Sequence, residues 1–249
     1  MRGLLQLTWV EIKVFVREPL GAIGTIVVPV IAFIYLGKAT AGETAAPSDA
    51  FSGLLAPGGI PTLLALTVTV SAVLSLANII SIYREGGILK RMRATPLRPW
   101  TILTSHVLVK LLLTALTMTL MLLAGKRYFS IGPEVPVVRF TLALLISVLS
   151  ILSLGFILAS VVPTPRFAQP IGAVIFYPMI GLSGLFVRTE SLPPKLRAVA
   201  KLLPFTHSTS LLQGIWTGDS WDMHRGDLFV LAVIFAISLA ITSRVFRWE

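Results

Sequence analysis

The sequence contains no cysteine, and this absence excludes disulfide bonds, thiolate nucleophiles and cysteine-ligated metals. Charged residues are also scarce, at 13% of 249 residues, whereas a soluble domain is typically about 25% charged. Hydrophobic residues make up 55% of the chain, and the mean hydropathy is +0.87. This composition predicts a polytopic membrane protein.

The motifs of common hydrolytic sites are missing as well. Gly37-Lys38 and Gly125-Lys126 lack both the hydroxyl residue and the upstream glycine of a phosphate-binding loop, so this chain is not expected to hydrolyse ATP. The sequence also has no His-Glu-x-x-His or Gly-x-Ser-x-Gly pattern. We expect the chain itself to bind no cofactor and no metal.

Six stretches are apolar enough to cross a membrane, which takes roughly 20 residues. They are expected at about 20–37, 60–82, 101–124, 138–161, 168–187 and 227–245. Residues 4–18 carry Leu5, Trp9, Ile12 and Val16 on one helical stripe, which predicts an interfacial helix rather than a span. The predicted fold is a single all-α membrane domain over residues 1–249.

The loop at 83–100 is the most basic part of the chain. Against the single acid Glu85 it carries Arg84, Lys90, Arg91, Arg93 and Arg98. Short basic loops stay on the cytoplasmic side, so six spans place both termini in the cytoplasm of a prokaryotic plasma membrane. The formal net charge of +10 lies mainly in such loops, which favours contact with anionic lipid over nucleic acid.

Two interpretations of this loop remain open. Gly86 and Gly87 can end the incoming helix, residues 88–94 can form a short basic helix, and Thr95-Pro96 can stop it. Such a helix at the inner membrane face is a handle for a soluble partner. The alternative is an ordinary positive-inside loop with no partner.

Residues 190–217 are too apolar for a solvated loop and too short to span. One helix is expected from Pro193-Pro194 to Leu203, and a second from about Thr206 to Trp216, ending near Gly218. Two re-entrant helices in the outer leaflet fit this pattern, provided that protein covers their polar backbone.

Two sets of polar residues could carry chemistry. Lys110 lies well inside the third predicted span, where a lysine costs about 3 kcal/mol. It either lines a polar pathway or extends to the inner interface. Before the last span, Asp219, Asp222, His224 and Asp227 could bind a metal or act as acid and base, although hydrophilic residues before a span explain them more simply.

The sequence resembles a permease of the ABC type-2 exporter family, the small six-span kind that includes daunorubicin-type drug exporters. The resemblance covers essentially the whole chain and depends first on the run from Arg84 to Pro96, Arg-Glu-Gly-Gly-Ile-Leu-Lys-Arg-Met-Arg-Ala-Thr-Pro. The family pattern is roughly Glu-Arg-Glu-x-Gly-Thr-Leu-x-x-Leu-x-x-Thr-Pro; Tyr83 and Ile88 depart from it. The second matching stretch is Leu203-Pro204-Phe205-Thr206-His207 with Leu211-Leu212-Gln213-Gly214.

This resemblance implies a permease that forms a homodimer and pairs with two ATP-binding cassette subunits, which hold ATP and Mg. Contact with those subunits would fall on the N-terminal helix and on the 83–100 segment, at Glu85, Ile88, Leu89, Arg91, Met92, Arg93 and Thr95. The implied cargo is a hydrophobic drug, antibiotic or lipid, with a polysaccharide or other glycoconjugate as the alternative within the family. A membrane-embedded enzyme that uses Asp219, Asp222 and His224 is the alternative of another class.

Overall fold

The computed structural model describes residues 2–41, 59–87, 99–129, 136–162, 164–183, 185 and 192–245. These residues form helices and contain no strand, which agrees with the all-α prediction. In chain order the elements are α1 (Arg2–Arg17), α2 (Pro19–Ala22), η1 (Ile23–Val27), α3 (Val28–Ala41), α5 (Gly59–Val70), η3 (Ser71–Leu76), α6 (Ala77–Glu85), α8 (Pro99–Tyr128), α9 (Val137–Val161), α10 (Pro165–Gly181), α11 (Pro194–Ala200), α12 (Pro204–Thr217), η5 (Trp221–His224) and α13 (Arg225–Val245).

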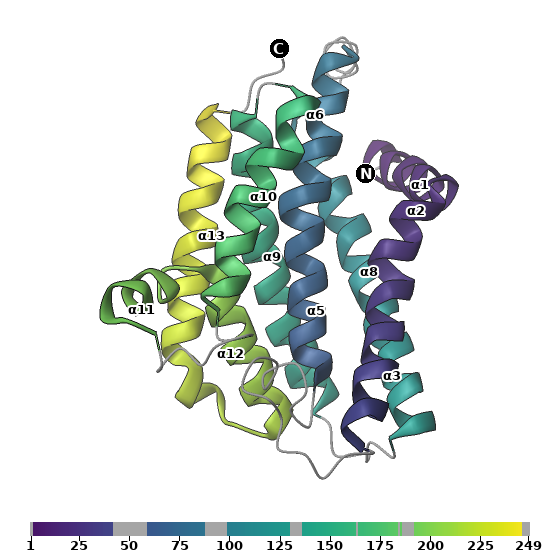
Figure 1. Cartoon of the computed structure of the whole chain (residues 1–249). Helices are drawn as coiled ribbons and strands as arrows, with labels where there is room; N and C mark the ends of the chain where they lie inside the picture. The colour runs from purple at the N-terminus through teal and green to yellow at the C-terminus, as the bar shows by residue number, and fades with distance from the viewer. Residues whose placement is uncertain are drawn as a thin grey trace.

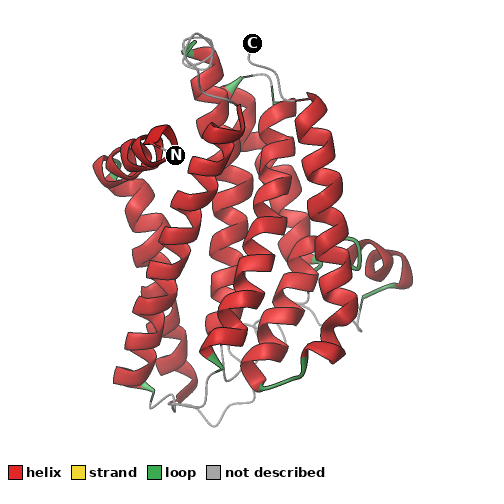
Figure 2. Cartoon of the chain, turned by 180° about the vertical axis from the view of Figure 1, so that it is seen from behind, coloured by secondary structure: helices red, strands yellow, loops and turns green. Residues whose placement is uncertain are grey.

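The long helices stand side by side in one bundle, and two short helices depart from its direction. Figures 1 and 2 show α1 lying across one end of the bundle and α11 projecting from its side. The end of α13, the start of α1 and the end of α6 lie toward the same end of the bundle (Figure 1). This arrangement places α1 beside the point where the chain enters the basic loop.

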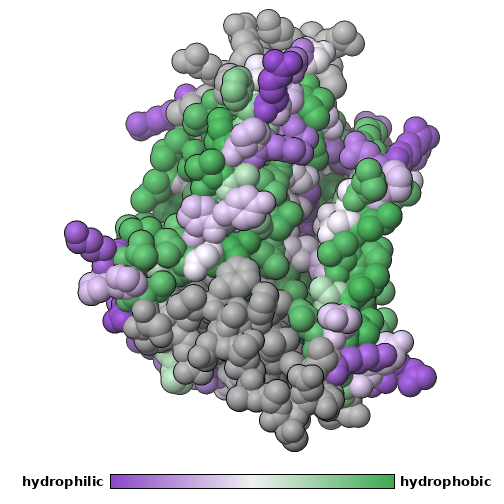
Figure 3. Space-filling view, viewed as in Figure 1, coloured by the Kyte–Doolittle hydropathy of each residue, from purple (hydrophilic) through white to green (hydrophobic). Residues whose placement is uncertain are grey.

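Five helical stretches in the described part of the chain are long and apolar enough to cross a membrane. They are Pro19–Lys38, Gly59–Tyr83, Thr101–Tyr128, Val137–Val161 and Trp221–Arg244. The span expected at 168–187 corresponds to α10, which has 17 residues and contains Pro170 and Pro178. On the face seen in Figure 3, hydrophobic side chains cover the middle and hydrophilic ones gather toward the two ends.

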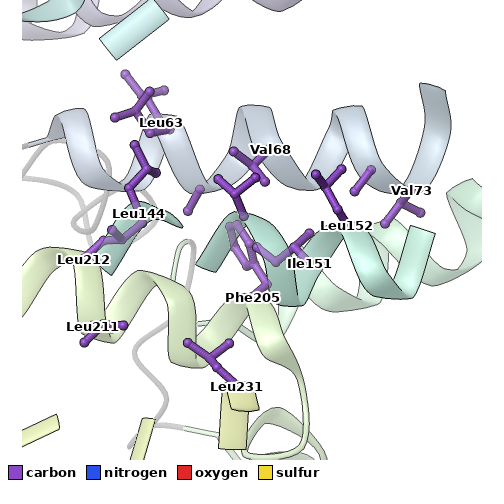
Figure 4. Close-up of a cluster of buried hydrophobic side chains, with 14 of the residues drawn as sticks. Leu63, Val68, Val73, Leu144, Ile151, Leu152, Phe205, Leu211, Leu212 and Leu231 are labelled. Carbon is purple, nitrogen blue, oxygen red and sulfur yellow. The ribbon is translucent and has the colours of Figure 1, made fainter. Parts of the chain in front are cut away.

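The core lies where α5, η3, α9, α12 and α13 meet. Figure 4 shows Val68 of α5 facing Ile151 of α9 and Phe205 of α12. The Phe205 side chain is fully buried. Burying apolar surface in this way stabilises the packing of protein on protein, while the remaining apolar side chains stay on the outer face of the bundle.

The first span is not a uniform α-helix, since Ile23–Val27 is π-helical. Pro29 explains part of this, because it has no N–H to donate to the carbonyl of Thr25. The Thr117 hydroxyl of α8, which donates to the Leu113 carbonyl at 2.9 Å, also lies 3.4 Å from the Thr25 carbonyl oxygen. A neighbouring helix thus brings a polar group to the backbone position that proline leaves open.

The segment before the last span holds two short helices, as predicted, but with different boundaries. α11 ends at Ala200 rather than Leu203, and α12 begins at Pro204 rather than Thr206. Proline suits the first turn of a helix and disfavours helical geometry in the residue before it, so Pro204 separates the two. Gly218 closes α12 with φ of 99°, where the sequence placed its end.

Candidate functional site

The basic loop begins as the sequence predicted. α6 ends at Glu85, and Gly87 follows in the left-handed region with φ of 64°. The Glu85 side chain is exposed. The predicted contact residues Ile88, Leu89, Arg91, Met92, Arg93 and Thr95 lie outside the described residues, so their role stays a prediction.

Lys110 is buried in α8, with only 6% of its surface exposed. Its Nζ donates a hydrogen bond to the Ser75 hydroxyl of η3 at 3.1 Å. Neighbouring acids lie outside α8: the charges of Glu11 and Glu18 both act on Lys110. A buried ammonium needs such partners, because an isolated charge in an apolar medium is strongly disfavoured.

Glu11 connects three helices. Its Oε1 accepts a hydrogen bond from the Tyr83 hydroxyl at 2.9 Å, and its Oε2 lies 3.5 Å from Nδ1 of His106. The Tyr83 and His106 rings also touch, with centroids 5.8 Å apart. We call Glu11, Ser75, Tyr83, His106 and Lys110 the Lys110 cluster.

A small cavity of about 100 Å³ adjoins this cluster, between α1, α6 and α8. Burial raises the pKa of the Glu11 carboxyl, while the hydrogen bond from Tyr83 and the charge of Lys110 lower it. The cluster therefore joins α1 to the bundle through polar contacts at a loosely packed junction.

Sequence reasoning identified Lys110 but not the residues around it. Two signals were available, and the first is that His106 and Lys110 are four residues apart and share a helix face. Glu11 interrupts an apolar run in the N-terminal helix, which is a second signal. The sequence alone does not show that α1 and α8 pack against each other, so the pairing could not be inferred.

A second polar cluster joins α12 to the start of α13, and Asp227 is its centre. The Asp227 carboxylate lies 2.6 Å from His207 Nδ1 and 2.9 Å from His224 Nδ1, and it accepts from the Ser210 hydroxyl at 2.9 Å. The other ring nitrogen of His224 lies 3.3 Å from Asp219. We call these residues the His207 cluster.

Both ring nitrogens of His207 face acceptors, since Nε2 lies 2.8 Å from the carbonyl oxygen of Lys201. The hydrogen bond with Asp227 raises the pKa of His207, against the opposing effect of burial. Gly214 makes room for the cluster, because a Cβ there would collide with the His224 ring. The arrangement holds α12, η5 and the first turn of α13 together.

This geometry does not assemble an acid–base or metal site from the predicted residues. Asp222 pairs with Arg225 at the surface, at 2.6 Å, and does not contact His224. In the part of the chain that the structure describes, no three His, Asp or Glu side chains are placed to bind a metal ion together. The Ser210 hydroxyl donates to the Asp227 carboxylate rather than to a histidine, so it does not form a serine–histidine pair.

An apolar cavity of about 240 Å³ lies between α8, α9 and α13. Its walls include Leu103 and Val107 of α8, Phe156 of α9, and Phe235 and Leu239 of α13. Among the described residues, no charged side chain lines it. Such a space suits an apolar molecule better than an ion or a sugar.

Curated relatives of this chain are transport permeases. The chain is 26% identical to "Probable multidrug ABC transporter permease YbhR" of Escherichia coli (strain K12) over 76% of its own length and 51% of that protein. It is 24% identical to "Daunorubicin resistance ABC transporter permease protein DrrB1" of Streptomyces coeruleorubidus over 96% of its length and 84% of the relative. "Inner membrane transport permease YhhJ" of E. coli (strain K12) matches at 25% over 79% of the chain and 51% of the relative.

The chain thus spans about half the length of two of these relatives and most of the third. A family model described as ABC-2 type transporter matches residues 2–217, which include the Lys110 cluster and all of α12. The chain therefore belongs to the ABC-2 type transporter family.

Proposed function

We propose that this chain is the permease subunit of an ATP-driven exporter. It would move a hydrophobic small molecule, such as a drug or antibiotic, or a lipid, out of the cytoplasm or the inner leaflet. Membership of the ABC-2 type transporter family over residues 2–217 is the observation that carries this proposal. The names of two relatives, which refer to multidrug transport and daunorubicin resistance, and the uncharged cavity between α8, α9 and α13 support the substrate class.

A separate ATP-binding cassette subunit would supply the energy, because the sequence has no phosphate-binding loop. We propose that two copies of that subunit contact α1 and the 83–100 segment of a permease homodimer. Ile88, Leu89 and Met92 would fill a groove on the ATPase, with Arg91 and Arg93 at its rim. Glu85, whose side chain is exposed where α6 ends, would contact the same subunit.

We further propose six spans, with α10 as the fifth and both termini in the cytoplasm. A 17-residue helix is about 25 Å long, close to the roughly 30 Å of bilayer hydrocarbon. α10 also packs along η3 and α6 inside the bundle. The exposed apolar residues Leu5, Trp9 and Val16 of α1 support an interfacial position for that helix.

The test is reconstitution with a candidate ATP-binding cassette protein, sought first in the reading frames that flank this gene. The two proteins are expected to co-purify, and inside-out vesicles that contain both are expected to accumulate daunorubicin only when ATP is present. Vesicles with the permease alone are the control. A chain that neither binds an ATPase nor transports any hydrophobic probe would contradict the proposal.

The docking segment can be tested separately in the same vesicles. Met92→Asp places a charge in the proposed apolar contact and is expected to prevent co-purification or to abolish transport. Arg91→Ala should have a smaller, salt-dependent effect, because rim charges mainly affect association rate and specificity. Normal assembly and transport in Met92→Asp would show that the segment is only a positive-inside loop.

A further inference from the structure

We propose that Glu11 is a positioning residue that couples α1 to the α5–η3–α6 span, so that a movement of α1 displaces the π-helical segment η3. This inference rests on the proposed function, because it identifies the route by which the ATPase would move the membrane helices. It is argued from the Lys110 cluster and from the packing around η3.

The first step concerns the junction of α1 and α6. Val14 and Phe15 of α1 face the cavity of about 100 Å³ from one side, and Ile79 and Ile82 of the span face it from the other. The two elements therefore do not meet through a closely packed apolar surface at this point. The hydrogen bond from Tyr83 to Glu11 crosses the gap beside the cavity, so it is the contact through which α1 can pull on the end of α6.

The second step concerns charge. Glu11 lies in α1 and Glu18 directly follows that helix, and both line the same cavity as Lys110, so the acids beside Lys110 move with α1. Displacing them would leave a buried ammonium without its counter-charge, which is strongly disfavoured. The Lys110 side chain is therefore constrained to follow α1.

The third step leads from Lys110 to η3, where its ammonium is hydrogen-bonded to Ser75. η3 is the six-residue stretch of the span in which the backbone is π-helical, a geometry that often occurs at functional sites because it interrupts the regular hydrogen-bond ladder. The Lys110 cluster thus acts on the segment of the span whose geometry is least regular.

The last step concerns the neighbours of η3. α9 and α10 approach it at Gly155 and Gly172, where an added Cβ would lie 2.4 Å from the Ala72 carbonyl oxygen and 3.1 Å from that of Val73. Backbones packed this closely cannot shift independently. A displacement of η3 would therefore move α9 and α10 as well.

The experiment compares four forms of the chain in complex with its ATPase: wild type, Glu11→Gln, Lys110→Met and the double variant. Glu11→Gln should lower the melting temperature, because Lys110 keeps its charge and loses one of its two nearby counter-charges. The double variant should recover most of that loss, since both charges are gone. Asp222→Asn, which neutralises an exposed carboxylate far from the Lys110 cluster, is the matched control.

The decisive measurement is hydrogen exchange of the backbone amides in residues 71–85, with and without ATP. In wild type and in Asp222→Asn we expect ATP to change these exchange rates at least threefold. In the double variant we expect that change to disappear while the ATPase still co-purifies. An undiminished ATP-dependent change in the double variant would overturn the inference, because Glu11 would then serve only to neutralise Lys110.

Tyr83→Phe tests the same route without touching either charge. It removes the hydroxyl that donates to Glu11 and keeps the ring beside His106, so the complex should form normally and the ATP-dependent change should fall at least twofold. An unchanged ATP-dependent change in hydrogen exchange in Tyr83→Phe would show that the hydrogen bond between Tyr83 and Glu11 does not transmit the movement to α6. If the wild-type chain forms no complex with an ATPase, the proposed function fails. If ATP changes the hydrogen exchange of residues 71–85 equally in wild type and in the variants, only this inference is contradicted.

Discussion

His207 shows how one residue can fix the position of two helices. Its two ring nitrogens face the Asp227 carboxylate and the Lys201 carbonyl oxygen, and both can be satisfied together only when the ring carries two protons. A neutral ring has one N–H and must give up one of these bonds. The raised pKa of His207 follows from this geometry.

This arrangement predicts a dependence of stability on pH. A group whose pKa is raised by folding contributes stability at low pH and loses it as the pH rises through the folded-state value. We expect the melting temperature to fall as the pH is raised from the ordinary histidine value of 6.5 through the raised pKa of His207.

His207→Gln is the matched variant for this measurement, because an amide does not titrate. The variant should have a lower melting temperature than wild type at acidic pH, and its melting temperature should fall less as the pH rises. A hydrogen bond to a charged group contributes about 1.5–3 kcal/mol, and partial exposure of His207 favours the lower part of that range. The same slope in wild type and in His207→Gln would show that His207 does not set it.

At the residue scale, the sequence predicts which side chains are unusual but not which ones meet. The insertion cost of a lysine inside a span identified Lys110. Its neighbours Glu11 and Ser75 come from an end helix and from a different span, 99 and 35 positions away. Such contacts depend on how the helices are arranged, and this information is not present in any local pattern.

At the scale of single elements, close approach of backbones explains where glycine is needed. Gly155 of α9 faces η3 without a side chain, and the Ala72 carbonyl occupies the space that a Cβ would require. Small residues at such crossings let membrane helices approach closely. Gly24, in the π-helical part of the first span, has nothing within 4 Å of its Cβ position.

These two glycines form a matched pair of tests. Gly155→Ala should lower the melting temperature, because overpacking costs about 1–3 kcal/mol. Gly24→Ala should leave it unchanged or raise it slightly, since alanine favours helix over glycine. Equal melting temperatures for the two variants in detergent would contradict the close packing of α9 on η3.

The lengths of the apolar stretches and the positions of proline and glycine predicted which segments are helical and roughly where each helix ends. The end of α6 at Glu85, just before Gly86 and Gly87, is an example. The π-helical segments were not foreseen. Pro29 gives a local reason for η1, but nothing in the sequence around Ser71–Leu76 marks a change of helix type. The packing of α12 against α5 and α9 was not predicted either, because the sequence indicated a re-entrant helix covered by protein but not which helices cover it.

At the scale of the whole molecule, charged side chains lie toward the two ends of the helix bundle and apolar side chains cover its middle (Figure 3). Hydrophilic side chains gather at the ends of the bundle, and the start of α1, the end of α6 and the end of α13 share one of them (Figures 1 and 3). α11 projects from the half of the bundle farther from that end. The proposed orientation places the end of α6 in the cytoplasm, because the basic loop begins there.

The absence of cysteine makes this orientation directly testable, since single cysteines can be introduced without background labelling. Lys195→Cys in α11 and Ala45→Cys should react with a membrane-impermeant maleimide in intact cells. Arg166→Cys at the start of α10 and Met92→Cys should react only after permeabilisation. The Lys195 and Arg166 side chains are exposed, so a lack of reaction there reports sidedness rather than burial. Reaction of Met92→Cys from outside would overturn the proposed orientation, because the charge of that loop sets it.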